Sequence, residues 1–307
     1  MPTNLASDRG FVLIVVIWTA ALLALLTLGF TRSAQTYVRT AANGVQSARA
    51  EALADTGFSL AVLDLMTNRR GNARDGQFPT DGSVVACAMD RDDLVLVSVQ
   101  DSGGRINLNL AGEALLKAFF VGLGSEPQDA ARYADTLLDY RDRDNERRAH
   151  GAEAPEYRLA GRTYGPKNAP FDNVEELQQV LGFGPDLIAS MAPHVTIHSS
   201  SAGLDPKVTR PELADIVSRG VARPLPKLQN LTGKASVPAE FVISSDQRNF
   251  LVHAEARLPS GAVYVREAVI ELPSNRATAY RLRAWYHGNA TSEASGTNLD
   301  QLVPAPC

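Results

Sequence analysis

The stretch FVLIVVIWTAALLALLTLGF occupies residues Phe11–Phe30 and contains no charged side chain. A helix rises about 1.5 Å per residue, so this run would span roughly the 30 Å hydrocarbon core of a bilayer. A secretory signal peptide has a shorter apolar core, followed by small residues at a cleavage site. Arg9 precedes the run and Arg32 and Arg39 follow it, so positive charge says little about orientation. The sequence therefore predicts a single membrane anchor.

The same helix is expected to continue well beyond the anchor. No proline occurs between Pro2 and Pro79, so nothing forces the helix to end at the membrane surface. We expect one helix from about Phe11 to Asn68, about 85 Å long, with its second half against a sheet. Small and apolar residues recur along it at helical spacing, which would let another helix approach closely. They are Val38, Ala41, Val45, Ala48, Ala52, Gly57, Leu60 and Leu63.

The rest of the chain changes from strands to helices and back to strands. Valine-rich and alternating segments predict strands at 83–89, 93–100, 249–258, 262–272 and 279–286. Between them, apolar periodicity predicts helices at 110–121, 127–140, 174–181, 185–191 and 210–219. Ser199–Gly203 (SSSAG) is typical of a linker. This order favours an α+β fold in which an α-helical insertion interrupts an antiparallel sheet.

Composition and charge narrow the function classes. The 307 residues are 45% hydrophobic and 21% charged, which leaves room for one or two compact domains. A net charge of −4 argues against a nucleic-acid binder, which usually carries a basic surplus. Cys87 and Cys307 are far apart and belong to no C-x-x-C pair. One disulfide and two unpaired thiols both fit the sequence.

The residues before the anchor suggest processing. Asp8 and Arg9 stand before Gly10 and Phe11, at the start of the apolar run. This arrangement resembles the leader of type IV pilins and pseudopilins, which a prepilin peptidase cuts between the glycine and the phenylalanine. The resemblance implies cleavage after Gly10 and methylation of Phe11. An uncleaved signal anchor would fit this segment nearly as well.

Four motifs in order extend the resemblance from Arg9 to about Leu272. Gly104–Asn109 (GRINLN) is similar to a "G-x-I-N-L-N" segment, and Asn168–Phe171 (NAPF) followed by Val174–Leu177 (VEEL) to an "N-x-P-F…x-E-E-L" segment. Between them, Asp139–Asp144 (DYRDRD), Gly151–Glu153 (GAE) and Tyr157 are similar to an acidic loop. Together with the leader, these motifs resemble the type II secretion system protein K family, which are large minor pseudopilins.

The resemblance implies a domain layout. It comprises a prepilin leader at 1–10, the transmembrane part of the helix at 11–30, and the pilin-like helix and first strands at 31–106. A SAM-like or helix-hairpin-helix-like α-helical insertion occupies 107–235, and returning strands occupy 236–286. The polar stretch 287–307 is expected to be a flexible tail.

The fifth residue after the predicted cleavage site is Val15. Ordinary pseudopilins carry a glutamate there, which can pair with the amine of a neighbouring subunit. A carboxylate in lipid is costly unless a partner neutralises it. Protein K also lacks this glutamate, which fits a subunit placed first, at the filament tip. An anchor that never polymerises would also tolerate Val15.

The acidic loop is a candidate calcium site. Carboxylates cluster within 22 residues, and calcium prefers six to eight oxygen ligands. It is no EF-hand, because Arg147 stands where that loop requires glycine. Interleaved arginines also allow a solvated helix end with ion pairs. The family is known for calcium in this loop, so the resemblance implies a structural ion. The matching positions are Asp142, Asp144 and Glu153, with Asp139 and Glu156 as weaker matches.

Two rival functions find some support in the sequence. Glu176–Gly184 resembles a helix-hairpin-helix, so a membrane-anchored DNA-binding or DNA-uptake protein is the alternative. The segment that follows the hairpin offers no nearby lysine or arginine to neutralise phosphates. For an enzyme, we find no G-x-S-x-G, no H-E-x-x-H and no glycine-rich phosphate loop. We therefore expect no catalysis and no nucleic-acid partner.

The resemblance finally implies location and partners. The chain is expected to be a single-pass protein of the bacterial inner membrane with its C-terminal body in the periplasm. Other minor pseudopilins would form a tip complex with it. The major pseudopilin and the inner-membrane assembly platform are also expected partners. The outer-membrane secretin and secreted cargo are further expected contacts. Its role would be to cap the pseudopilus and start its assembly for the export of folded proteins.

Overall fold

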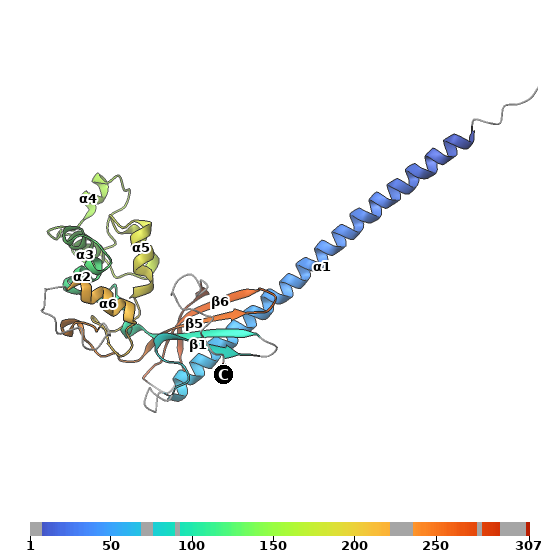
Figure 1. Ribbon diagram of the computed structural model, residues 1–307. Coiled ribbons are helices and arrows are strands. Elements are labelled where there is room, and N and C mark those ends of the chain that lie inside the picture. The colour runs from blue at the N-terminus through green and yellow to red at the C-terminus, as the bar shows by residue number, and fades with distance from the viewer. Residues whose placement is uncertain (1–7, 69–75, 90–92, 222–235, 275–277, 289–304) are drawn as a thin grey trace, which may run out of the picture.

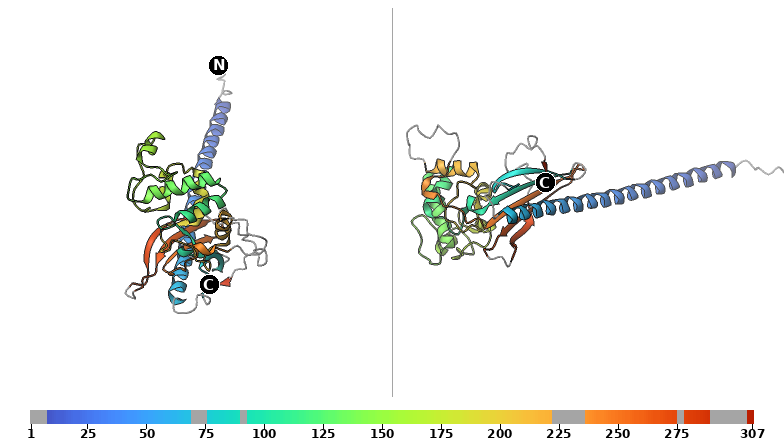
Figure 2. Two further views of the ribbon diagram at one scale, coloured as in Figure 1. Left: turned by 90° about the vertical axis from the view of Figure 1, so that its left-hand side faces the viewer. Right: turned by 90° about the horizontal axis from the view of Figure 1, so that it is seen from below.

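The computed structural model describes residues 8–68, 76–89, 93–221, 236–274, 278–288 and 305–307. A single helix, α1 (Asp8–Asn68), runs unbroken for 61 residues, as predicted. Its N-terminal part projects away from the rest of the protein, and its C-terminal part lies against a sheet (Figure 1). By length and composition α1 can cross a membrane, and its most apolar window is fully exposed. The shorter helices gather at the other end of the sheet (Figure 2).

The main sheet has the strand order β7-β6-β5-β2-β1-β8. Its neighbouring strands are antiparallel, except that β8 runs parallel to β1. The predicted hairpin around Pro259–Gly261 joins β5 to β6. The strand bounds are β1 Asp81–Ala88, β2 Leu94–Asp101, β5 Asn249–Arg257, β6 Val263–Glu271, β7 Arg281–His287 and β8 Ala305–Pro306.

The sheet and α1 share one apolar core. Small residues of α1, among them Ala50 and Ala54, lie buried against the sheet together with Phe58. On β5 and just beyond it, the predicted face of Val252, Ala254, Ala256 and Leu258 is buried in this core. Alternation along a strand puts every second side chain on one face, which explains the agreement. The α+β, pilin-like fold expected from the sequence is therefore confirmed.

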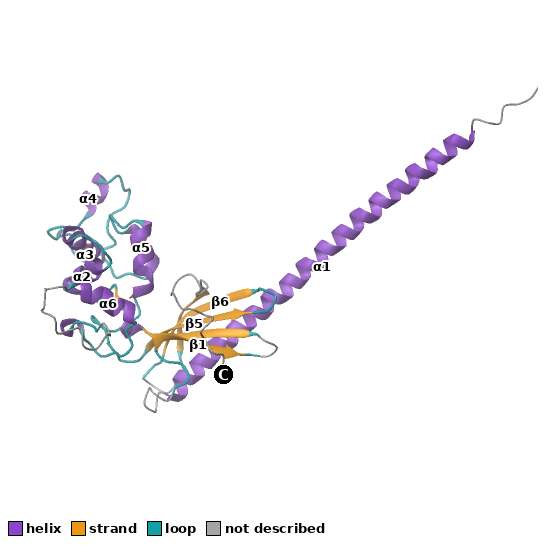
Figure 3. Cartoon of the chain, in the orientation of Figure 1, coloured by secondary structure: helices purple, strands orange, loops and turns teal. Residues whose placement is uncertain are grey.

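The helical part is an insertion between two neighbouring strands. The chain leaves the sheet at the end of β2 and returns at β5, and these two strands pair directly, with Val97 opposite Ala254. The inserted segment has a core of its own, separate from the core under α1. Figure 3 shows its helices grouped beside the sheet. They are α2 Glu113–Gly122, α3 Pro127–Arg141, α4 Ala154–Leu159, α5 Pro185–Met191 and α6 Pro211–Gly220, with a short two-stranded sheet of β3 (Ile106–Asn107) and β4 (Val195–Thr196).

Two predictions for the insertion need correction, and one helix was not predicted. The helix expected over 174–181 is a 3₁₀ turn, Val174–Gln179, because side-chain hydrogen bonds tighten its start. Helix α4 was not predicted, since six residues are too few to show periodicity. Ser199–Gly203 is no loose linker: Ser199 and Ser201 are buried, and Ser201 exchanges hydrogen bonds with Gly203.

The C-terminal end is also more ordered than expected. His287 ends β7 instead of beginning a tail, and Ala305–Pro306 add a strand beside β1. Cys307 forms a disulfide with Cys87, with their Cα atoms 5.3 Å apart. A covalent link next to a strand pairing explains why this end stays at the sheet. The stretch 289–304 of the predicted flexible tail lies outside the described residues, as do 222–235 of the predicted insertion.

Candidate functional sites

Three predicted ligands meet between α3 and α4. Asp142 directly follows α3, Asp144 lies two residues further, and Glu153 directly precedes α4. One ligand oxygen from each lies within 4.8 Å of the other two. The folded chain therefore brings together the three carboxylates that the sequence singled out.

Two of these carboxylates, those of Glu153 and Asp142, have buried oxygens without the partners that buried charges need, whereas Asp144 is exposed and accepts the backbone N–H of Glu146 at 2.8 Å. Glu153 is only 3% exposed. Its side chain faces the backbone N–H of Glu156 in a capping box, but neither carboxylate oxygen makes a regular hydrogen bond. Oδ1 of Asp142 is likewise buried without a partner. Burial, reinforced by the carboxylates of Asp139, Asp142 and Asp144, raises the pKa of Glu153 from 4.5 to about 7. Burial is also the main cause that raises the pKa of Asp142. A cation at this point would remove the cost of these unpaired charges.

The donor set indicates which cation fits. All three side chains offer oxygen and none offers nitrogen or sulfur. Hard cations such as Ca²⁺ prefer such ligands, and Ca²⁺ completes its shell with backbone carbonyls and water. The residues present therefore fit calcium. The alternative is an acidic helix end neutralised by arginines. It accounts for Asp139 and Glu156, which lie 3.3 Å from Arg148 and 3.6 Å from Arg147, but within the three-carboxylate group it reaches only Oδ2 of Asp142, 3.5 Å from Arg148.

The two weaker matches, Asp139 and Glu156, have other partners. Asp139 is fully buried and accepts a hydrogen bond from the backbone N–H of Arg148, whose Nε lies 3.3 Å from Oδ1. Oε2 of Glu156 accepts the backbone N–H of Glu153 at 3.0 Å. Both side chains fix the backbone of the loop that carries the three-carboxylate group. Burial, partly offset by that backbone hydrogen bond, raises the pKa of Asp139 to about 6.

The glycine of the G-A-E motif has a steric reason. A Cβ at Gly151 would lie 1.9 Å from Oδ2 of Asp139, so any other residue would displace that buried carboxylate. The neighbouring His150 donates its backbone N–H to Asp135 at 3.0 Å. The loop after α3 therefore folds back onto the acidic side chains of α3 itself, which places Glu153 near Asp142.

One supporting residue was not predicted as part of the site. Asn168 adopts φ 52°, a left-handed conformation that asparagine tolerates better than most residues. Its Nδ2 donates to the carbonyl of Asp144 and to Oδ1 of Asn145, both at 2.9 Å. It is the asparagine of the N-x-P-F segment, so the motif itself held the signal.

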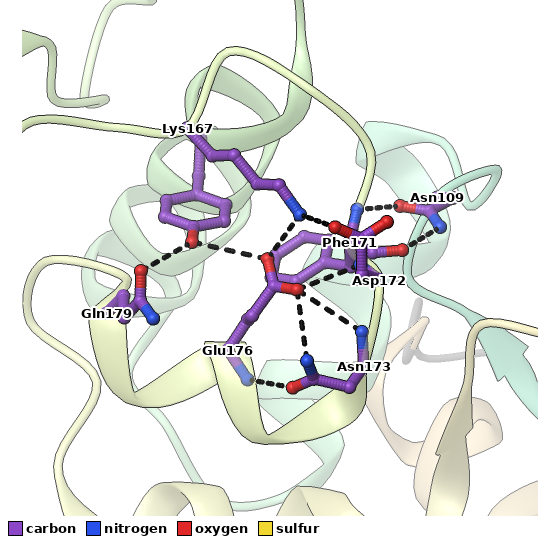
Figure 4. Close-up of polar contacts among 8 residues, drawn as sticks. Asn109, Lys167, Phe171, Asp172, Asn173, Glu176 and Gln179 are labelled. Atoms are coloured by element: carbon purple, nitrogen blue, oxygen red, sulfur yellow. Dashed lines mark hydrogen bonds and ion pairs between the residues drawn. The ribbon is translucent and has the colours of Figure 1, made fainter. Parts of the chain in front are cut away.

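The E-E-L segment forms a polar clasp, which Figure 4 shows in close-up. Oε1 of Glu176 accepts the backbone N–H groups of Asp172 and Asn173, and Oδ1 of Asn173 accepts the N–H of Glu176 in return. Lys167 donates to Glu176 at 2.8 Å and to Asp172 at 2.7 Å. This buried glutamate accepts the backbone N–H groups at the start of the 3₁₀ turn and pairs with the charge of Lys167. Its role is structural.

Two other motifs meet at the same clasp. Oδ1 of Asn109, in the G-x-I-N-L-N segment, accepts the backbone N–H of Phe171, while its Nδ2 donates to the Phe171 carbonyl. The ring of Phe171 stacks on Tyr140 at the end of α3, with centroids 4.9 Å apart. Figure 4 shows Asn109 and Phe171 beside the clasp. The family motifs therefore converge on one structural joint at the end of α3, where the acidic group begins.

The hairpin at Glu176–Gly184 is a packing element. Leu177, Val180 and Phe183 are buried in the insertion core. The N–H of Leu181 donates to the hydroxyl of Tyr157 at 3.0 Å, so it does not face solvent. Gly182 takes φ +85°, which permits the tight turn. Nothing in this arrangement favours phosphate binding.

Six of the eight residues of the predicted small-residue stripe on α1 lie on its exposed face, and two do not. Val38, Ala41, Val45, Ala48, Ala52 and Leu63 are exposed, and they lie on the face of α1 opposite the sheet. Gly57 instead faces the sheet, where a Cβ would lie 2.6 Å from Val95. Leu60 packs partly against the same core. We call the six exposed residues the outer stripe.

The predicted processing residues lie at the N-terminal end of α1. Gly10 and Phe11 are within α1, and the Phe11 side chain is exposed. Val15 is exposed one turn further along the same helix. Cleavage after Gly10 would leave the apolar stretch at the new N-terminus.

Three comparisons with known proteins bear on these sites. The family model described as "Type II secretion system (T2SS), protein K" matches residues 95–200, from β2 through most of the insertion. No curated protein matches the sequence. Among solved structures, the chain is similar to one in the crystal structure of the GspK-GspI-GspJ complex from the type 2 secretion system of enterotoxigenic Escherichia coli. The two are 19% identical with a TM-score of 0.54, over 85% of this chain and 99% of that chain. These findings confirm the resemblance that the motifs indicated.

Proposed function

We infer that the chain belongs to the protein K family of the type II secretion system and works as a minor pseudopilin without enzymatic activity. One observation carries this inference. A pilin-like rod and sheet hold, between the neighbouring strands β2 and β5, a helical insertion whose sequence matches the protein K model. The DNA-binding alternative is not favoured, because the hairpin that suggested it packs into the insertion core.

The rod and the disulfide support a location in the bacterial inner membrane with the body in the periplasm. The apolar part of α1 is free of contacts with the body and long enough to span a bilayer. Cys87 and Cys307 are joined, which suits an oxidising compartment. Prepilin peptidase would cut after Gly10, and Phe11 would then be methylated.

Assembly would use the exposed length of α1. The outer stripe offers small side chains on the face opposite the sheet, so the rod of another pseudopilin can approach closely. The solved complex contains GspK, GspI and GspJ, and we propose the corresponding minor pseudopilins as partners of this chain. The outer stripe would then pack against these partners. The major pseudopilin and the inner-membrane assembly platform are proposed as further partners.

A position at the tip follows from two features. Val15 replaces the glutamate that would dock a subunit beneath a neighbour, so this subunit needs no neighbour above it. The insertion projects from the end of the sheet away from the rod, where a repeated filament would leave little room for it (Figure 1). At the tip it would start assembly and could meet the secretin or folded cargo.

Calcium at Asp142, Asp144 and Glu153 would be structural. When bound, the ion neutralises three carboxylates that the fold holds together. Asp139, Glu156 and Asn168 hold the backbone on which they stand. The result would be a fixed connection between α3 and α4.

Secretion and binding assays test the proposed function. In a strain lacking this gene, the wild-type chain should restore export of folded proteins, and purified chain should bind the other minor pseudopilins of that system. Ala52→Glu, on the outer stripe, should weaken both. Ala189→Glu, exposed on α5, is the matched control and should affect neither. Export restored in full by Ala52→Glu, or a wild-type chain that binds no minor pseudopilin, would contradict the proposal.

A further inference from the structure

Strand β7 presents large apolar side chains on the side of the sheet that carries α1. Leu282 is 50% exposed and Trp285 41% exposed. They pair across the strands with Ile270 and Ala268, both of which are buried in the core under α1. Paired residues on neighbouring strands point to the same face, so Leu282 and Trp285 lie beside α1. We call these two residues the α1–β7 ledge.

Trp285 is held in place although it is half exposed. Its ring meets Phe58 of α1 edge to face, with centroids 4.9 Å apart. The guanidinium of Arg266 lies over the ring, 4.4 Å from its centroid. Two α1 carboxylates fix this arginine, Asp55 at 2.7 Å and Glu51 at 2.9 Å. Binding hot spots are enriched in tryptophan and arginine, and a tryptophan held rigid before binding loses little entropy there.

The charges around the ledge say what kind of partner fits. The positive charge of Arg266 is already matched by two carboxylates, and Arg281 and Arg283 of β7 both pair with Glu271. The ledge therefore offers apolar area with balanced charge, which gives an acidic peptide or a phosphate little to bind. An apolar helix face is the matching surface.

The ledge continues the outer stripe sideways around α1. Ala52 belongs to the stripe, and Asp55, which holds Arg266, is three positions further on the helix and so is its neighbour on the surface. Phe58, against which Trp285 packs, follows after another three. A helix seated on the outer stripe and a helix seated on the ledge are thus contiguous positions on one surface.

We propose that the α1–β7 ledge docks the N-terminal helix of a second minor pseudopilin, beyond its membrane-spanning part, where that helix stacks beside α1. This inference rests on the proposed function and adds to it a contact outside the rod itself. At the opposite edge of the sheet, β8 pairs only with Cys87 and Ala88 of β1. On this side, β7 is the terminal strand among the residues that the structure describes. Addition of a partner strand to the β7 edge is the competing mode, and crosslinking from the ledge separates the two.

The affinity of the full-length chain in detergent for each purified minor pseudopilin of the same system tests the ledge. Trp285→Ala should weaken binding to one of them about tenfold, because truncated aromatic anchors cost that much or more. Trp285→Phe should retain most of the affinity. Leu159→Ala is the control, since Leu159 is 87% exposed on α4 and far from the ledge in sequence and fold. An unchanged melting temperature shows that each variant folds.

A photo-crosslinking residue at position 282 identifies what the ledge touches. The proposal predicts adducts within the N-terminal helix of the partner. Adducts on a partner strand would indicate strand addition and overturn the proposal. Equal affinities for Trp285→Ala and wild type would also overturn it, while weaker binding by Ala52→Glu in the same assay would leave the proposed function standing. If the wild-type chain binds none of the minor pseudopilins, the proposed function fails as well.

Discussion

Removal of the proposed calcium ion should make the stability of this protein depend on pH through Glu153. In the metal-free fold, the pKa of Glu153 is raised from 4.5 to about 7, so the folded state holds this proton more tightly than the unfolded chain does. Between these two values the free energy of unfolding must then fall as the pH rises. At 1.36 kcal/mol per pKa unit, the difference corresponds to about 3 kcal/mol at most. Above pH 7 this contribution to the free energy of unfolding is fully lost, and added calcium should restore the stability.

The assay is denaturation of the full-length chain in detergent, followed by circular dichroism, with chelator or with calcium. Glu153→Gln removes the charge and one ligand together. At pH 8 with chelator it should be more stable than wild type by up to about 3 kcal/mol, and calcium should stabilise it far less. Glu146→Gln changes an exposed acid of the same loop and should match wild type in both conditions. The reasoning is refuted if wild type and Glu153→Gln lose stability equally between pH 5 and 8 with chelator, or if calcium stabilises both equally.

Three further substitutions test how the fold is held. Gly220→Ala should destabilise the insertion by several kcal/mol, because the new Cβ would lie 1.6 Å from a carbonyl oxygen of α2. Gly44→Ala, with open space around it, should stabilise α1 slightly. Equal melting temperatures for the two variants would contradict this. Glu176→Ala should cost about 3 kcal/mol by removing one of the two partners of the half-buried Lys167 and the acceptor of two backbone N–H groups. The exposed Glu175→Ala should cost almost nothing, and urea denaturation measures both. Cys307→Ser removes a disulfide that spans 220 residues and should lower the free energy of unfolding by up to about 5 kcal/mol. If the loss comes from the bond, the melting temperature of the variant should equal that of reduced wild type.

The long elements were predictable because their signals are local. The unbroken α1 follows from a proline-free run and a continuous apolar stretch, and the β5–β6 hairpin follows from strict alternation around Pro259–Gly261. The insertion was also visible, since a change from period two to helical spacing and back marks where the chain leaves and re-enters the sheet.

What the sequence could not show depends on contacts between distant segments. The pairing of Cys87 with Cys307 was left open, because spacing alone does not reveal that Ala305–Pro306 lie beside β1. Gly57 was assigned to the exposed small-residue stripe by spacing, yet the sheet approaches α1 so closely there that only glycine fits. The α1–β7 ledge had no sequence signal, because its position beside α1 is set by the order of strands in the sheet.

In the acidic loop, the sequence identified the residue types but could not assign their roles. Asp142, Asp144 and Glu153 came from matching positions in a family, and their oxygens do meet. Asp139 and Glu156 are equally acidic, but hydrogen bonds to backbone N–H groups occupy them. Only the fold distinguishes a carboxylate that holds the loop from one that is left without a partner.

The mass of the mature chain, isolated from membranes of cells with an active prepilin peptidase, tests the central claim most directly. A minor pseudopilin must lose residues 1–10 and begin with a methylated Phe11. Intact-mass and N-terminal peptide analysis should therefore find this species and little else. A chain that retains Met1–Gly10 in those cells would be an ordinary signal-anchored protein, which contradicts its assignment as a pseudopilin.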